Sequence, residues 1–261
     1  MKATSNHELR DHLQRAGVEQ GVNLTIHSNL SALGLLEGGV SRLYETLREM
    51  VGPHGTIAVP AYRIGTPSDE IFDPEKSPSF QVGAFSEYVR KLEGTRRTAN
   101  PIHSHALHGP LADLACRIEL PASFGQTSDF EFFVTNRFKV LFLGCDFENA
   151  GTLVFHAQAC AGNIPYRSWQ TAKRKVMLRS QVDGGERVVE LAFPYYARIN
   201  GAPKETRRGL ERELRAGGLI REAKLPYGAS LAFEYAPVHA ELLKIFARNP
   251  LACVSESETQ A

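Results

Sequence analysis

The stretch from residue 23 to residue 60 constrains the fold more than any other part of the chain. Apolar and polar residues alternate over 23–28, which predicts a short strand. A loop of small residues follows over 27–34, and a helix is expected from Ser41, as its N-cap, until a Gly-Pro pair ends it at residue 52. The apolar run 56–60 predicts a second strand. This order of strand, loop, helix and strand is typical of an α/β layer, in which ligands bind at the loops that follow the strands.

The rest of the chain extends this pattern and then changes after residue 167. Helical spacing predicts further helices at 7–16, 82–92, 111–117, 205–216 and 238–246, and a buried strand is expected at 140–144. Two runs, 173–180 and 186–193, predict a β-hairpin. We therefore expect one α/β domain over 1–261, a central mixed β-sheet flanked by helices with a small additional β-containing lobe. Its parts are a core of about 7–167, the lobe and C-terminal helices of about 168–252, and a tail at 253–261.

Composition excludes several classes of protein and partner. Hydrophobic residues make up 43% of the chain and charged residues 23%, as in ordinary globular proteins. The net charge is +1, so no overall field favours nucleic acid or an anionic membrane. No apolar stretch reaches the roughly 20 residues of a transmembrane helix, and no secretory signal is recognisable. The four cysteines have no CxxC spacing, which favours reduced thiols and a cytoplasmic location.

Common catalytic motifs are missing, and the histidines carry most of the remaining information. The sequence has no GxSxG elbow, no GxGxxG fingerprint and no P-loop. His103, His105 and His108 suggest a metal-dependent hydrolase, but no carboxylate stands at ligand spacing and no HExxH pattern exists. On an extended backbone His103 and His105 face one side and His108 the other. His156 and Cys160 stand four residues apart, so on a helix they share a face and could act as base and nucleophile, although a cysteine near a histidine is more often a buried apolar residue. We therefore expect no metal.

Seven segments occur in an order that resembles a known family. They are IHSNLSALG, GPHGTIAVPAY, FDPEKSPSFQVGAFSEYVR, RRTANPIHSHALHGP, FGQTSDFE, VLFLG and LVFHAQACAGNIPYR. Together they resemble the aminoglycoside 3-N-acetyltransferases, antibiotic acetyltransferases unrelated to the GNAT fold, from about residue 20 to residue 167. The resemblance implies transfer of an acyl group, most often acetyl from acetyl-CoA, to an amine of an aminoglycoside or another amino sugar. In such enzymes the amine attacks the thioester directly.

The resemblance also implies roles for individual residues. His156 falls on the family's catalytic histidine and is expected to act as the general base. The loop formed by His27, Ser28, Asn29, Leu30 and Ser31, together with His103 and Ser104, corresponds to segments that lie near the cofactor. For the amine acceptor the candidates are Tyr62, behind the second strand, and the acids of the long loop, since polycations call for carboxylates. These acids are Asp69, Glu70 and Asp73.

One position departs from the family pattern and keeps other functions open. The family carries a glutamate three residues after the histidine, where this chain has Ala159. Without that carboxylate the imidazole loses a group that orients it and favours its protonated form. Four acids from other loops are possible substitutes: Asp129, Glu131, Asp146 and Glu148. The alternatives are an acyltransferase for a different amine or acyl donor, and a protein that binds coenzyme A without turnover.

Overall fold

The computed structural model of the chain describes residues 3–117, 122–179 and 185–255, and its centre is a mixed β-sheet. Three parallel strands form the middle of the sheet, with β2 between β8 and β4. Antiparallel strands extend it on both sides, which confirms the predicted central mixed sheet. In spatial order the strands are β11 (Arg221–Leu225), β12 (Gly228–Glu234), β8 (Lys139–Leu143), β2 (Leu24–Ser28), β4 (Ile57–Pro60), β7 (His105–His108) and β6 (Arg96–Arg97).

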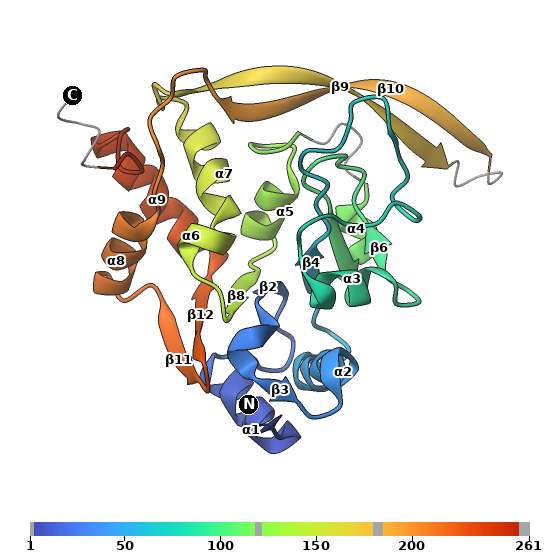
Figure 1. Cartoon of the computed structure of the whole chain (residues 1–261), viewed down its shortest axis with the longest axis vertical. Coiled ribbons are helices and arrows are strands. Elements are labelled where there is room, and N and C mark those ends of the chain that lie inside the picture. The colour runs from blue at the N-terminus through green and yellow to red at the C-terminus, as the bar shows by residue number, and fades with distance from the viewer. Residues whose placement is uncertain (1–2, 118–121, 180–184, 256–261) are drawn as a thin grey trace.

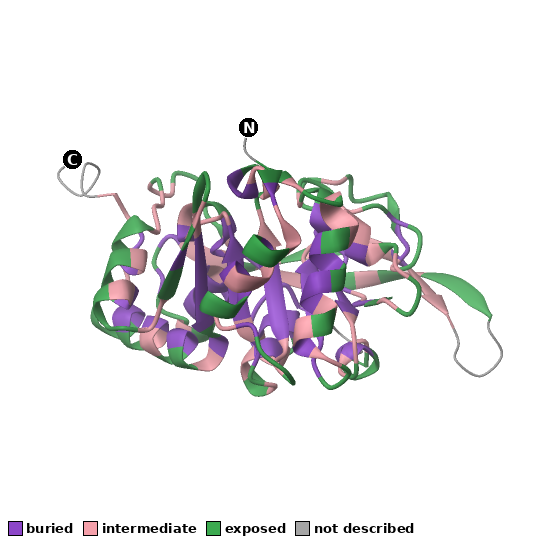
Figure 2. Cartoon of the chain, turned by 90° about the horizontal axis from the view of Figure 1, so that it is seen from below, coloured by how far each residue is buried: buried purple, intermediate pink, exposed green. Residues whose placement is uncertain are grey.

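Each face of the sheet is covered by its own set of helices (Figure 1). Strand β8 shows why: Leu141 and Leu143 pack on one face, whereas Val140 and Phe142 pack on the other. The first face holds α1 (Asn6–Arg15), α2 (Gly39–Val51) and α3 (Ala84–Arg90). The second holds α4 (Ala112–Ala115), α5 (Asp129–Thr135), α6 (Phe147–Ala150), α7 (Thr152–Ala161), α8 (Arg208–Ala216) and α9 (Tyr235–Arg248). Figure 2 shows the buried residues gathered along the sheet and the inner sides of these helices.

The first two helices, α1 and α2, are capped differently at their N-termini. Ser5 and Glu8 form a reciprocal capping box at the start of α1. Ser41 was expected to cap α2, and this is wrong, because the N-cap is Gly38, three residues earlier. Gly38 has a φ of 75°, which a glycine adopts without steric cost, and the Ser41 hydroxyl donates to its carbonyl. The short strands β1 (Ala3–Thr4) and β3 (Leu35–Leu36) pair beside this region.

A long hairpin passes over one end of the sheet (Figure 1). Its strands are β9 (Arg167–Arg179), which begins earlier than the sequence pattern predicts, and β10 (Glu186–Arg198), which begins as predicted and ends later. The turn between them lies outside the described residues. Strand β5 (Ile71–Phe72), from within the long loop 63–80, adds to β9 in parallel. The hairpin therefore anchors that loop, and this three-stranded sheet is the additional β element that was expected.

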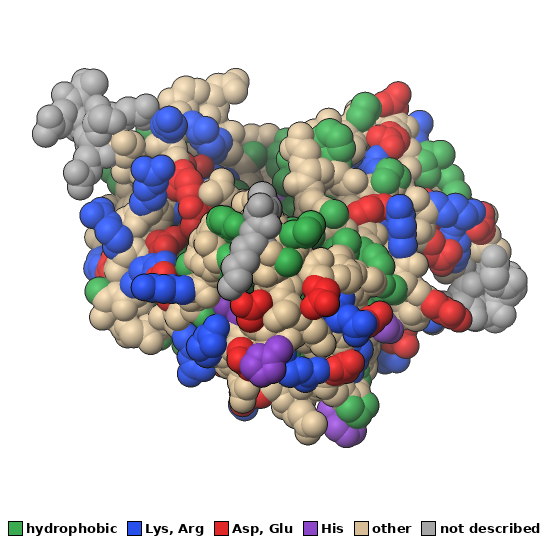
Figure 3. Space-filling view, turned by 60° about the horizontal axis from the view of Figure 1, so that its bottom comes forward, with side chains coloured by type: hydrophobic (Ala, Val, Ile, Leu, Met, Phe, Trp, Pro, Cys, Tyr) green, Lys and Arg blue, Asp and Glu red, His purple; other side chains and the backbone are tan. Residues whose placement is uncertain are grey.

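The segment after β10 returns to the central sheet. Strands β11 and β12 supply its edge next to β8, and α8 and α9 cover one of its faces. The division into a core and a lobe at about residue 168 stays a prediction, and most of the expected tail lies outside the described residues. No helix in the described part of the chain has the length and apolar character needed to span a membrane. On the face shown in Figure 3, acidic and basic side chains are interspersed, in keeping with the near-neutral charge.

Candidate functional site

The expected site residues converge at one edge of the sheet because of strand direction. Strands β2, β4 and β8 run in parallel, so His27 and Ser28, Tyr62 and Gly144 all stand where these strands end. Strand β7 is antiparallel to β4, and its first residue, His105, pairs with Pro60 at the same edge. The segment 103–105 therefore joins the loops that the sequence identified.

The loop after β2 lies directly against the end of β8. The Asn29 amide donates to the Leu143 carbonyl at 2.8 Å, and Leu30–Leu33 form a 3₁₀ turn. Gly144 approaches so closely that a Cβ there would stand 2.6 Å from the Asn29 carbonyl oxygen, and its φ of 73° also favours glycine. A cavity of about 250 Å³ opens beside this contact, lined by Asn29, Gly144, Cys145 and Asp146 together with Arg215 and Leu231. The Ser28 Oγ is buried and has no hydrogen-bond partner among the described residues.

His103 and Ser104, two of the predicted cofactor residues, have different surroundings. His103 packs edge-on against Tyr62 and shares a hydrogen bond with Ser123 through Nδ1 at 3.0 Å. Ser104 is completely buried; its hydroxyl donates to the Ala61 carbonyl and accepts from Arg97. Burial lowers the pKa of Arg97 to about 9. These contacts favour a structural role for Ser104 and Arg97, whereas His103 is partly exposed.

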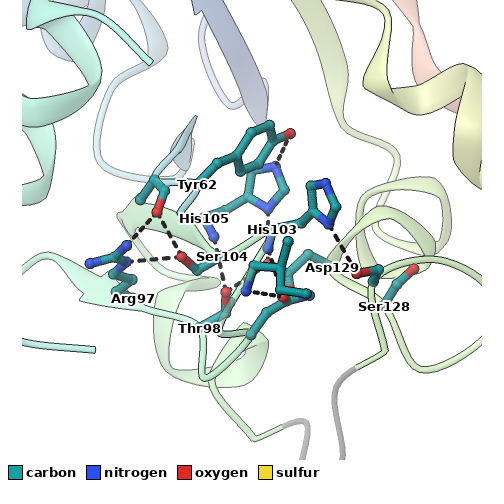
Figure 4. Close-up of polar contacts among 12 residues, drawn as sticks. Tyr62, Arg97, Thr98, His103, Ser104, His105, Ser128 and Asp129 are labelled. Atoms are coloured by element: carbon teal, nitrogen blue, oxygen red, sulfur yellow. Dashed lines mark hydrogen bonds and ion pairs between the residues drawn. The ribbon is translucent and has the colours of Figure 1, made fainter. Parts of the chain in front are cut away.

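A chain of buried polar groups runs behind this edge (Figure 4). The Asp129 carboxylate accepts from Thr98 Oγ1 at 2.6 Å and lies 2.8 Å from His105 Nδ1. With the Nδ1 proton directed to Asp129, the His105 Nε2 accepts from the Tyr62 hydroxyl at 3.2 Å. Burial raises the pKa of Tyr62, which keeps this hydroxyl a donor. Tyr62, expected to contact the acceptor, is only 5% exposed and is held inside this network.

The histidines of the metal hypothesis are directed to separate partners. His105 binds Asp129 and Tyr62, His103 binds Ser123, and His108 stacks on Tyr44 of α2. His103 and His105 both face Tyr62, whereas His108 does not, as the extended backbone predicted. This arrangement offers no common point for one metal ion.

His156, the predicted base, lies between three helices on the other side of α5. It belongs to α7, it is completely buried, and its ring stacks on Phe130 of α5 and on His239 of α9. Nδ1 accepts the Gly125 amide at 3.1 Å, and Nε2 lies 3.3 Å from the Glu131 carboxylate. This network assigns the proton to Nε2, which donates to Glu131. Both ring nitrogens are therefore engaged.

Glu131 provides the carboxylate partner of His156 that is missing at Ala159. Of the four possible substitutes for the carboxylate missing at Ala159, Asp129 binds His105, Asp146 caps α6, and Glu148 accepts from the Arg207 amide. Only Glu131 lies at His156 within the described residues. The hydrogen bond from His156 lowers the pKa of Glu131, against the opposing effect of its partial burial. The Glu131 side chain is 33% exposed, so it connects the buried imidazole with the surface.

The acids of the long loop are mostly engaged in holding that loop. Asp73 is buried, and Arg179 of β9 binds both its oxygens at 2.8 and 2.7 Å. This hydrogen bonding lowers the pKa of Asp73 to about 2. Glu70 pairs with the buried Arg63, and Asp69 is exposed. Their contacts favour a structural role for Asp73 and Glu70 and leave Asp69 free to face solvent.

The comparison with family models agrees with this geometry. Residues 25–247 match the model described as aminoglycoside 3-N-acetyltransferase. The chain belongs to that family. The match includes the edge loops, His156 and α9, and therefore both sides of the site.

Individual members of the aminoglycoside 3-N-acetyltransferase family differ widely from this chain. Aminoglycoside N(3)-acetyltransferase III of Salmonella sp is 31% identical over 186 residues, which is 64% of each chain. The chain thus matches less than two thirds of that relative's length. The solved structure of AAC-VIa bound to sisomicin has a TM-score of 0.78 at 25% identity, covering 95% of this chain and 99% of the other. That of AAC-IIIb with CoASH has a TM-score of 0.77 at 23% identity, covering 95% and 98%.

Three site residues were not identifiable as members of one cluster from the sequence. In the sequence Glu131 is one of four candidate acids, spacing relates Cys160 to His156 alone, and no pattern singles out His239. Spacing gives the relation of His156 to Cys160, because both lie on one helix. Only the packing of α5 and α9 against α7 brings Glu131 and His239 to the same ring.

Proposed function

We propose that this protein transfers an acetyl group from acetyl-CoA to an amine of an aminoglycoside, with small-molecule acceptor and acyl-CoA as its partners. The observation that carries the proposal is the carboxylate of Glu131 at 3.3 Å from His156 Nε2. It supplies, from another helix, the acid that Ala159 does not. Membership of the family supports the reaction class. The neighbour solved with sisomicin supports the acceptor class.

The Glu131–His156 pair is assigned to proton removal. His156 is enclosed and Glu131 is partly exposed, so Glu131 is the member that faces an arriving ammonium group. The pair takes one proton from the ammonium, and the freed amine attacks the thioester carbonyl carbon. A C–N bond forms and the C–S bond breaks. The thiolate of coenzyme A takes up the proton that the pair held, and the second amine proton passes to water.

The edge loops are assigned to the thioester and its arm. Ser28 Oγ, buried and without a protein partner in the described part, can donate to an oxygen of the cofactor or of the tetrahedral intermediate. The cavity of about 250 Å³ at Asn29 and Gly144 offers space for part of the pantetheine chain. His27 closes this side through edge contacts with Tyr62 and Phe142. The four cysteines are free thiols, which supports the proposed cytoplasmic location.

Acceptor binding is assigned to exposed carboxylates. Glu131 is the best placed, because its charge is maintained by the hydrogen bond from His156. Asp69 is the member of the loop acids that remains exposed and available. An ammonium group bound by Glu131 would be held beside the proton acceptor, which shortens the path to attack geometry.

The test is release of thiol from acetyl-CoA by the purified chain, with sisomicin and with glucosamine as acceptors. We expect amine-dependent release, and His156→Ala should lower turnover by about 10²-fold or more while acetyl-CoA still binds. His54→Ala, at an exposed histidine after α2, is the matched control and should behave as wild type. Unchanged turnover in His156→Ala would remove His156 from the role of base.

A second function is favoured by one observation. His156 is completely buried and both its ring nitrogens have partners, so no lone pair of the imidazole faces solvent. This arrangement suits a protein that binds coenzyme A without turnover. Binding of acetyl-CoA with no thiol release for any amine would support this function over the first. Failure to bind acetyl-CoA would contradict both.

A further inference from the structure

Two histidines and a cysteine meet on the side of His156 that faces α9. His156 and Cys160 are one turn apart on α7, and His239 comes from α9. One nitrogen or sulfur atom from each residue lies within 4.8 Å of the others. The Cys160 Sγ is 3.9 Å from His156 Nδ1, and the two imidazole rings stack with centroids 4.7 Å apart. The arrangement brings together three groups of the kind that bind zinc.

His239 provides an independent indication that a ligand belongs here. Its side chain is 7% exposed, and its Nε2 is buried without a hydrogen-bond partner among the described residues. A buried imidazole nitrogen without a partner is costly, since native structures pair nearly all such groups.

The hydrogen bonds of His156 fit metal binding through Nδ1. Its Nε2–H donates to Glu131, so Nδ1 is the nitrogen that carries a lone pair, and the Cys160 sulfur lies 3.9 Å from Nδ1 and 3.8 Å from Nε2. A carboxylate that accepts from the far nitrogen of a metal-binding histidine is the usual outer support of such sites. The Gly125 amide now donates to Nδ1 and would be displaced. Four tetrahedral zinc ligands at normal bond lengths stand about 3.3–3.8 Å apart, so the 3.9 Å between sulfur and Nδ1 requires little movement.

The charge of the cluster and its access to solvent also suit a divalent ion. Zn²⁺ would be faced by the thiolate of Cys160 and, through the imidazole, by the carboxylate of Glu131, so two negative charges balance the ion. Cys160 is the exposed member and gives the ion a path from solvent, while His156 and His239 are buried. Nitrogen and sulfur ligands select Zn²⁺ and similar ions over Mg²⁺ or Ca²⁺.

We propose that His156, Cys160 and His239 form a binding site for Zn²⁺ or a similar thiophilic divalent ion, with Glu131 as outer support and water as fourth ligand. Binding breaks the Cys160 S–H bond, forms a metal–thiolate bond and releases one proton to solvent. Metal binding itself does not depend on the proposed acetyl transfer. Its consequence, inhibition by occupation of His156, rests on that proposed function.

The experiment titrates the chelator-treated full chain with ZnCl₂ and, for spectroscopy, with CoCl₂. We expect one ion per chain, one proton released per ion, and a thiolate-to-cobalt charge-transfer band in the near ultraviolet. Cys160→Ser should remove the band, and both this variant and His239→Asn should lower zinc affinity by about 10²-fold. Cys116→Ser, at a partly buried cysteine beside α4, is the matched control and should bind zinc as wild type does.

The outcomes separate the site from the reaction. Equal zinc affinity in wild type, Cys160→Ser and His239→Asn would overturn the proposed site, as would equal loss in Cys116→Ser. Circular dichroism of each variant establishes that it is folded, and Cys160→Ala replaces Cys160→Ser if the serine variant is not. If thiol release occurs, zinc should inhibit it in wild type and not in Cys160→Ser. If no thiol release occurs at all, the titration alone decides the metal site.

Discussion

Two buried histidines lie on opposite sides of α5, and each is paired with an acid from the first turn of that helix. Asp129 binds His105 at 2.8 Å, and Glu131 lies 3.3 Å from His156. Positions two apart on a helix point in nearly opposite directions, so one short segment serves both histidines. The two pairs thus share a design but have different surroundings.

The difference between the pairs lies in exposure and in the third partner. Asp129 and His105 are each 1% exposed as side chains, and Thr98 and Tyr62 bind to them in an enclosed network, in which Asp129 Oδ1 has no partner among the described residues. Glu131 is 33% exposed, and next to His156 lie Cys160 and His239, whose Nε2 has no hydrogen-bond partner among the described residues. A closed network contributes to stability, whereas a pair with one open side can exchange protons with a ligand. We therefore assign a structural role to the first pair and chemistry to the second.

Among the substitutions that test this comparison, removal of Asp129 should have the largest effect, and the effect is on stability. Asp129→Ala leaves His105 Nδ1 and Thr98 Oγ1 buried without their acceptor. We expect the free energy of unfolding to fall by about 3–5 kcal/mol, as for other broken buried pairs. Urea denaturation measures it. A loss below about 1 kcal/mol would contradict the structural role.

Replacement of Glu131 should affect activity and leave stability nearly unchanged. Glu131→Gln keeps the shape and removes the charge that faces the amine. We expect turnover in the thiol-release assay to fall by about 10²-fold, because the proton acceptor loses its carboxylate. The free energy of unfolding should change by less than about 1 kcal/mol, as is usual for a partly exposed ion pair. If stability falls as far as in Asp129→Ala, the two pairs do not differ in role.

The sequence predicts the architecture of the edge well and the partners of the histidines poorly. Strand β8 is a short apolar run that ends in glycine, and its direction next to β2 brings the expected loops together. Strand β11, by contrast, has mostly exposed and charged residues, REAKL, so no apolar alternation announces it. It is stabilised by its pairing with β12, which only the tertiary structure provides.

The same limit applies to the site. Local patterns allow His156 to lie on a helix, but they cannot select Glu131 from four acids, because the choice depends on how α5 packs on α7. They also overestimate the acids of the long loop. Asp73 resembles a site residue in sequence, yet its carboxylate is bound by Arg179, which lies 106 positions away.

A carboxylate introduced at position 159 should have a smaller effect, and it tests whether the acid at His156 must come from α5. Ala159 is 8% exposed and packs in the core, so Ala159→Glu should lower the free energy of unfolding by about 1–3 kcal/mol through overpacking. In wild type we expect lower turnover, since a second carboxylate beside Glu131 adds like charge. In Glu131→Gln the same substitution should restore turnover about 10-fold, because positions 156 and 159 are neighbours on α7. No recovery in the double variant would show that only α5 can present the acid.

The smallest expected effect is a change of stability with pH, and it concerns the histidines without an acidic partner among the described residues. His27 contacts aromatic rings and His103 contacts Ser123, and burial lowers the pKa of each to about 3. Below the unfolded value of about 6.5, the unfolded chain binds more protons than the folded chain, so stability falls as the pH falls toward 3. Each histidine should lower the free energy of unfolding by about 1 kcal/mol between pH 6.5 and 5.5. Urea denaturation of wild type and His103→Asn at both pH values isolates this contribution, because the other titrating groups are common to both. The variant should lose less stability over this interval, and equal losses would show that His103 is protonated in the folded state, as expected of a histidine with an acid partner.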